Sequence, residues 1–347
     1  MVYYNNYNNF NQYDYNMQIM QMRRNEKYKI RTAATKLGII MIAYILLSTI
    51  FQYIFYFVSY AYLNHHISLN MNTIISYLRS NQDIVNSAAF NYSANIFIVG
   101  FSLLITLLIA TSLLDVEIGN MISFKNKPVK TALTWFPVCM IVNMIFSTLI
   151  NIVTLIFGSA GFTIPQSDFS VTNTDTASII LQFLYIVILG PIAEELIYRG
   201  VILSILKPYG KWAAVIISAL FFGLMHGNIP QAVPAFCGAI VYGLIAVRFN
   251  SIIPTIIIHM LNNGLTMYTD FASALHWPKA PYYAVIIGII LIGFYIMLTR
   301  MKELKIGQQV TALTTGQKVS TIIFSPAIII YLLMLLYRIV KFIVSAN

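Results

Sequence analysis

Two adjacent glutamates and an arginine lie in an apolar stretch of this chain that is long enough to cross a membrane. Glu194, Glu195 and Arg199 occur within the apolar run 177–206, shortly after Pro191. An ionisable residue at the centre of a membrane helix costs about 2.5–3.5 kcal/mol on insertion scales, so these side chains together cost about 8–10 kcal/mol. A cost of this size favours a functional site inside the membrane.

Helical spacing places the two glutamates on different faces. On a helix, Glu195 and Arg199 are i and i+4 and can pair, whereas Glu194 points about 100° away. The pattern predicts one structural carboxylate, neutralised by Arg199, and one free carboxylate, Glu194, directed at the interior of the bundle. Pro191 removes a helical hydrogen bond and predicts a local kink just before the pair.

Two histidines also lie in apolar segments, each with a partner one helical turn away. Phe222 and His226 are i and i+4, as are His259 and Asn263, so each pair shares a face. Taken alone, a membrane histidine is more often a hydrogen-bonded packing residue, and a lone asparagine joins helices. Because these groups and the glutamates fall within four consecutive apolar segments, the sequence favours one shared site.

Three motifs therefore occur in order on separate apolar segments: Glu194-Glu195-x-x-x-Arg199, Phe222-x-x-x-His226 and His259-x-x-x-Asn263. Together they resemble the CAAX-protease and bacteriocin-processing family, the abortive-infection-type intramembrane proteases that include the type II prenyl-protein endopeptidases. The resemblance covers roughly residues 180–270. It implies an intramembrane protease, with the remaining segments outside the shared part.

Peptide hydrolysis needs a nucleophile, a base and stabilisation of the tetrahedral oxyanion. No apolar segment offers a Ser–His–Asp or reactive-cysteine arrangement tied to these residues, so water is the predicted nucleophile. Our hypothesis is that Glu194, helped by His226, takes a proton from water. The resemblance implies that His259 and Asn263 donate hydrogen bonds to the oxyanion. The predicted catalytic residues are Glu194, Glu195, Arg199, His226, His259 and Asn263.

Zinc chemistry is an alternative that the residue types leave open. Glu194, His226 and His259 could bind Zn²⁺ with water in the fourth position, as catalytic zinc sites do. Against this, the chain has no HExxH helix, and adjacent glutamates on a regular helix do not both face one ion. Cys139 and Cys237 lie in apolar segments without metal-binding spacing. Zinc is thus the one cofactor that the sequence suggests, without requiring it.

The composition excludes a soluble globular fold. The 347 residues are 59% hydrophobic and 9% charged, with a mean hydropathy of +0.75, whereas soluble domains carry about 25% charged residues. We expect an all-α polytopic transmembrane helical bundle with eight or nine spans. The nine candidate segments are 38–63, 95–114, 130–158, 177–206, 212–227, 231–248, 251–269, 281–299 and 320–342.

The charge distribution predicts topology rather than nucleic-acid binding. The net charge is +10, and lysines and arginines concentrate at alternate loops, which favours a cytoplasmic N-terminus. The ninth segment breaks this alternation, since it would place Arg338 and Lys341 outside. The polar composition of residues 1–32 has no apolar face to bury, which predicts a disordered cytosolic tail. The tail is followed by N-terminal transmembrane helices at 33–176, a catalytic transmembrane core at 177–270 and C-terminal transmembrane helices at 271–347.

The predicted function is an intramembrane endopeptidase that cleaves a membrane-associated or lipidated peptide. Its expected partners are a peptide or protein substrate and membrane lipid, without nucleic acid; the sequence leaves the oligomeric state open. The Asn-, Ile- and Tyr-rich composition is typical of an AT-rich bacterial genome, so the expected location is a bacterial plasma membrane. Two alternatives stay open: a non-catalytic membrane scaffold, for bacteriocin immunity or another partner, and an ion-coupled transporter, which would also place Glu, His and Arg in mid-membrane.

Overall fold

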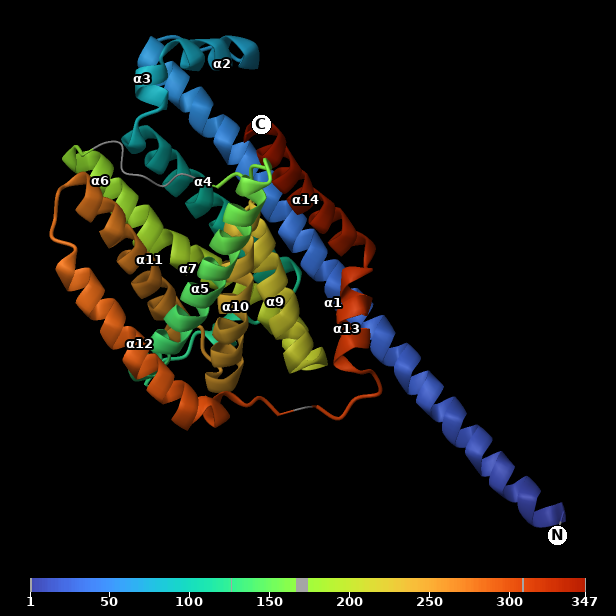
Figure 1. The fold of residues 1–347 in the computed structure, drawn as a ribbon. Helices are drawn as coiled ribbons and strands as arrows, with labels where there is room; N and C mark the ends of the chain where they lie inside the picture. The colour runs from blue at the N-terminus through green and yellow to red at the C-terminus, as the bar shows by residue number, and fades with distance from the viewer. Residues whose placement is uncertain (1, 126, 167–173, 308, 347) are drawn as a thin grey trace.

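A computed structural model of the protein describes residues 2–125, 127–166, 174–307 and 309–346. The described residues form helices and connecting segments without strands (Figure 1). The α-helices are α1 (Val2–Asn64), α2 (Met71–Ser80), α3 (Gln82–Val85), α4 (Ala88–Leu108), α5 (Pro128–Ser159), α6 (Thr176–Phe183), α7 (Gly190–Glu195), α8 (Leu203–Leu206), α9 (Lys211–Met225), α10 (Ile229–Phe249), α11 (Ile253–Ala274), α12 (Ala280–Arg300), α13 (Thr315–Ile323) and α14 (Pro326–Ala346).

The apolar segments predicted from the sequence coincide with helices, except that the ninth is divided between α13 and α14. Within the described residues, 7 helical stretches are long and apolar enough to cross a membrane: Asp14–Asn64, Ala88–Ser112, Pro128–Ser159, Thr176–Tyr209, Ile229–Phe249, Ala280–Leu304 and Pro326–Ser345. Helix α9 is shorter, and α11 is less apolar because it carries His259, Asn262 and Asn263. The protein is an all-helical integral membrane protein; the predicted eight or nine spans are not confirmed.

The N-terminal region differs from the disordered tail that the sequence predicts at 1–32. Residues 2–32 are part of α1, which continues without a break to Asn64; Met1 lies outside the described residues. The polar composition has no helix breaker, since no glycine or proline precedes Gly38. The helix therefore extends outward from the membrane span, and Figure 1 shows its N-terminal part projecting from the bundle.

Contacts with the C-terminal region hold the base of this extension. The Glu26 carboxylate accepts hydrogen bonds from the backbone N–H groups of Ala312 and Leu313, at 2.9 and 3.1 Å, and pairs with Lys318 at 3.2 Å. One turn later Ile30 is fully buried. These long-range contacts are absent from any local sequence pattern, which explains why the sequence alone predicts a tail where the chain is helical.

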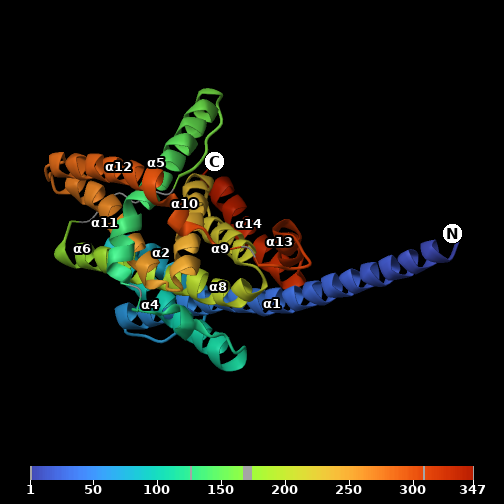
Figure 2. The ribbon, with the colours of Figure 1, turned by 90° about the horizontal axis from the view of Figure 1, so that it is seen from below.

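The helices are arranged around α9 and α10 (Figure 2). Helix α10 packs against both α9 and α5, and α11 and α12 also pack on α5. Helix α1 packs along α4 and α14. Figure 2 shows α9 and α10 near the centre, with α11 and α12 on one side and α13 and α14 on the other. The stretch that carries the glutamates contacts α4, α9 and α11 and is thus surrounded by other helices.

Small residues permit the closest helix contacts. A Cβ atom on Gly293 of α12 would lie 2.8 Å from the Pro137 carbonyl oxygen and 2.5 Å from Ile141 Cδ1, both on α5. Such small residues at helix contacts are typical of membrane bundles, because they let backbones approach.

Gly293→Ala is therefore expected to destabilise the protein by about 1–3 kcal/mol, since the added methyl group must push the α5 backbone away. Gly288→Ala is the matched control on the same helix, because a Cβ atom added there would meet no other atom within 4 Å. The free energy of unfolding, measured by denaturing titration in mixed micelles, separates the two variants. Equal stabilities would show that α5 and α12 do not pack at Gly293.

Candidate active site

The helical stretch that carries the glutamates changes its winding on both sides of them. A π-helical segment, Leu184–Leu189, precedes α7, and a second, Leu196–Ile202, begins directly after Glu195. Such π-helical turns frequently occur at functional sites, because the wider turn redirects side chains and frees backbone groups. The sequence predicts a kink at Pro191; the structure places π-helical turns before and after it.

Glu195 and Arg199 form the buried ion pair that their spacing predicts. Arg199 Nη1 donates to Glu195 Oε1 at 2.7 Å, and both side chains are 0% exposed. The guanidinium carbon also lies 4.3 Å from the centroid of the Phe222 ring and 5.2 Å from that of Tyr242. Pairing and cation–π contact compensate the burial of both charges.

His259, on α11, links the two glutamates. Its Nδ1 lies 3.1 Å from Glu195 Oε1 and its Nε2 lies 3.7 Å from Glu194 Oε2. Because an ionised carboxylate only accepts hydrogen bonds, Nδ1 is the donor to Glu195, and Nε2 faces Glu194. The Glu194 side chain is 27% exposed, whereas that of Glu195 is fully buried. Glu194 is thus the accessible carboxylate of the pair.

His226 follows the last residue of α9 and lies beside the Phe222 ring. Its Nδ1 donates to the Phe222 carbonyl oxygen at 2.8 Å, so the lone pair of the neutral ring is on Nε2. The Phe222 ring centroid is 5.1 Å from that of His226 and 5.7 Å from that of His259. Among the described residues, the histidine in ion-pair range of Glu194 is His259 and not His226. The predicted assistance of Glu194 by His226 would therefore act through the attacking water rather than through an ion pair.

Asn263 joins α11 to the first π-helical segment. Its Nδ2 donates to the Ile186 carbonyl oxygen at 2.9 Å. Its Oδ1 accepts from Asn262 Nδ2 at 3.1 Å, and Asn262 Oδ1 accepts from Asn143 Nδ2 at 2.9 Å. Sequence reasoning missed Asn143, although an amide in the apolar run 130–158 was a signal for an interhelical hydrogen bond. These hydrogen bonds fix the orientation of the three side-chain amides.

The residues do not fit the zinc site that the sequence leaves open. Among the described residues, no group of three or more His, Cys, Asp or Glu side chains is placed to hold a metal ion. Glu194, His226 and His259 therefore do not form a ligand set in this arrangement. The buried Arg199 cation beside Glu195 also disfavours a second cation there.

Residues 176–265 match the family model described as type II CAAX prenyl endopeptidase Rce1-like. Comparisons with curated proteins and with solved structures gave no match. The matched segment extends from α6 into α11 and includes the six predicted catalytic residues, whereas Asn143 lies outside it. The segment that carries the candidate site is therefore similar to the Rce1-like type II CAAX prenyl endopeptidases.

Proposed function

We propose that the protein is an intramembrane endopeptidase in which Glu194 activates a water molecule for attack on a peptide bond. The observation that carries this proposal is the unequal pair of carboxylates. Glu195 is fully buried and neutralised by Arg199, whereas the neighbouring Glu194 is 27% exposed and faces His259. A carboxylate that can meet water beside a hydrogen-bond donor is suited to general base catalysis.

The proposed reaction begins when Glu194 accepts a proton from water and the water oxygen bonds to the carbonyl carbon. The carbonyl π electrons move to its oxygen, which becomes the oxyanion of a tetrahedral intermediate. That intermediate collapses as the C–N bond breaks, and Glu194 returns the proton to the leaving amine. The products are a carboxylic acid and an amine, and the glutamate is restored.

His259 and Asn263 are the proposed donors to the oxyanion. When His259 carries both ring protons, the Nδ1–H group remains bonded to Glu195 and the Nε2–H group is available beside Glu194. Asn263 uses one Nδ2 hydrogen for the Ile186 carbonyl and keeps a second. Fixed donors directed at developing charge lower the barrier. His226 Nε2, with its lone pair, is proposed to orient the attacking water.

The hydrogen bonds that link Asn143, Asn262 and Asn263 predict a role for Asn143 in positioning Asn263. Asn143→Ala is expected to lower kcat about tenfold with KM nearly unchanged, because a misplaced donor mainly affects the transition state. Asn151→Ala is the matched control, since Asn151 lies on the same helix and is exposed. Steady-state kinetics on a cleaved peptide provide the measurement. An unchanged kcat for Asn143→Ala would show that Asn143 does not position Asn263.

The substrate is proposed to be a peptide or protein end held at the membrane, lipidated or otherwise membrane-associated, in a bacterial plasma membrane. A comparison of membrane peptidomes identifies it, using cells that carry the wild-type protein, Glu194→Gln or the control Glu117→Gln at an exposed glutamate. We expect a defined set of cleaved ends that disappears only with Glu194→Gln. Identical peptidomes, with His226→Ala and His259→Ala cells keeping their phenotype, would favour a non-catalytic scaffold instead.

A further inference from the structure

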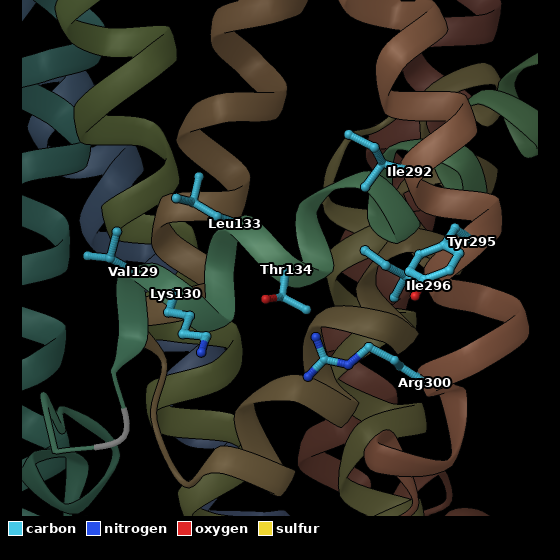
Figure 3. Close-up of a pocket in the computed structure, with 8 residues that line it drawn as sticks. All are labelled: Val129, Lys130, Leu133, Thr134, Ile292, Tyr295, Ile296 and Arg300. Carbon is cyan, nitrogen blue, oxygen red and sulfur yellow. The ribbon is translucent and has the colours of Figure 1, made fainter.

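A separate cavity lies between α5 and α12, away from the glutamates. Its volume is about 540 Å³ and Figure 3 shows the residues that line it. The walls are apolar side chains that include Val129 and Leu133 of α5 and Ile292 and Tyr295 of α12. These four side chains are 54–65% exposed, so the cavity is an open groove on the surface of the bundle. We refer to it as the α5–α12 groove.

Polar groups meet at one end of the groove. Lys130 and Arg300 extend into it from opposite helices, with Thr134 between them (Figure 3). Arg300 Nε and Nη2 donate to the Glu303 carboxylate at 2.7 and 2.8 Å, which fixes the guanidinium and leaves Nη1 available. Lys130, Arg300 and Glu303 together carry one net positive charge. One phosphodiester would balance it.

The register of the two helices places this polar end at a membrane interface. Both helices are long and apolar enough to span, and Lys130 is in the first turn of α5 while Arg300 ends α12. Further into the span, α12 contacts the α5 backbone at Gly293 and Pro137, so the groove is open toward the basic end. Its charged groups thus lie at head-group depth, and its apolar walls lie at the depth of acyl chains.

We propose that the α5–α12 groove binds one anionic phospholipid, with its phosphodiester between Lys130 and Arg300 and its acyl chains along Val129, Leu133 and Ile292. A free phosphate ion would leave the apolar walls exposed. A zwitterionic lipid would bring a second ammonium group to a site that already holds two cations. Thr134 supplies a neutral donor to the same phosphate. This site is independent of the proposed catalytic reaction.

Native mass spectrometry of the full-length protein in detergent tests the proposal, with phosphatidylglycerol, phosphatidylcholine and diacylglycerol of matched chains added in turn. We expect one phosphatidylglycerol to bind the wild-type protein in preference to the other two. Lys130→Gln should weaken that binding about fivefold, the effect of one lysine near an anionic head group. Lys125→Gln is the matched control, because Lys125 is an exposed lysine close in the chain that does not line the groove.

A second variant tests the same proposal without a change of charge, in case Lys130→Gln perturbs folding. Leu133→Trp fills the groove and retains both cations, so it should reduce lipid occupancy without altering the charge. Equal binding of phosphatidylcholine, unchanged binding in Lys130→Gln, or displacement of the lipid by millimolar inorganic phosphate would overturn the proposal. So would a protein dimer that occupies the groove, seen as a dimer peak lost in Leu133→Trp.

Discussion

Glu194→Gln is expected to lower the rate of peptide cleavage by about 10²–10⁴-fold, the range over which general acid–base groups contribute. Glutamine has nearly the same shape but cannot accept the proton of the attacking water. The structural consequence should be small, because the Glu194 side chain is 27% exposed and its ion-pair contact with His259 is a long one, 3.7 Å. The purified variant should therefore remain folded while its activity is lost.

The measurement is the initial rate of cleavage by wild type and variant in liposomes, with thermal unfolding as the check on folding. Glu117→Gln, at an exposed glutamate outside the bundle interior, should cleave at the wild-type rate. Addition of a metal chelator should leave the wild-type rate unchanged, because the described residues form no ligand set. Cleavage by folded Glu194→Gln within threefold of wild type would remove Glu194 as the base.

Arg199→Leu is expected to destabilise the protein by about 3–5 kcal/mol, because it leaves the Glu195 carboxylate buried without its counter-charge. Both side chains are 0% exposed, so water cannot replace the lost partner. The loss of cation–π contact with Phe222 and Tyr242 adds to the effect. Denaturing titration in mixed micelles measures the change in the free energy of unfolding.

The double variant Glu195→Leu/Arg199→Leu separates charge from packing. Removing both charges should recover most of the lost stability, because a buried ion pair can often be replaced by apolar residues. Cleavage should not recover, since His259 loses the carboxylate that holds its Nδ1. A double variant that is as unstable as Arg199→Leu would show that the pair is not the main source of the effect. One that cleaves normally would show that Glu195 does not position His259.

Several features of the site were predictable from local spacing. The i, i+4 relation of Glu195 and Arg199 correctly predicted their pairing, even though Arg199 lies within the second π-helical segment. The different face of Glu194 also predicted that Arg199 pairs with Glu195 and not with Glu194. The motif order also predicted the family of residues 176–265. These predictions succeeded because helical periodicity and the cost of membrane burial are local properties.

Other features depended on how separate helices meet. The approach of His259 Nε2 to Glu194 depends on the packing of α11 against α7. Asn143 was missed because its partner Asn262 is 119 positions away. The contact of Glu26 with Leu313 spans 287 positions and joins the N-terminal helix to the C-terminal region. No spacing rule within one segment carries this information.

The most direct test of the catalytic site is cleavage in H₂¹⁸O by the purified protein in liposomes, using a peptide that accumulates in Glu194→Gln cells. Wild-type protein should cleave it at one bond and place a single ¹⁸O atom in the new carboxyl group in the first turnover, while folded Glu194→Gln protein leaves the peptide intact. If folded wild-type protein produces no cleavage, or cleaves as fast without the Glu194 carboxylate, these membrane side chains do not form a hydrolytic site.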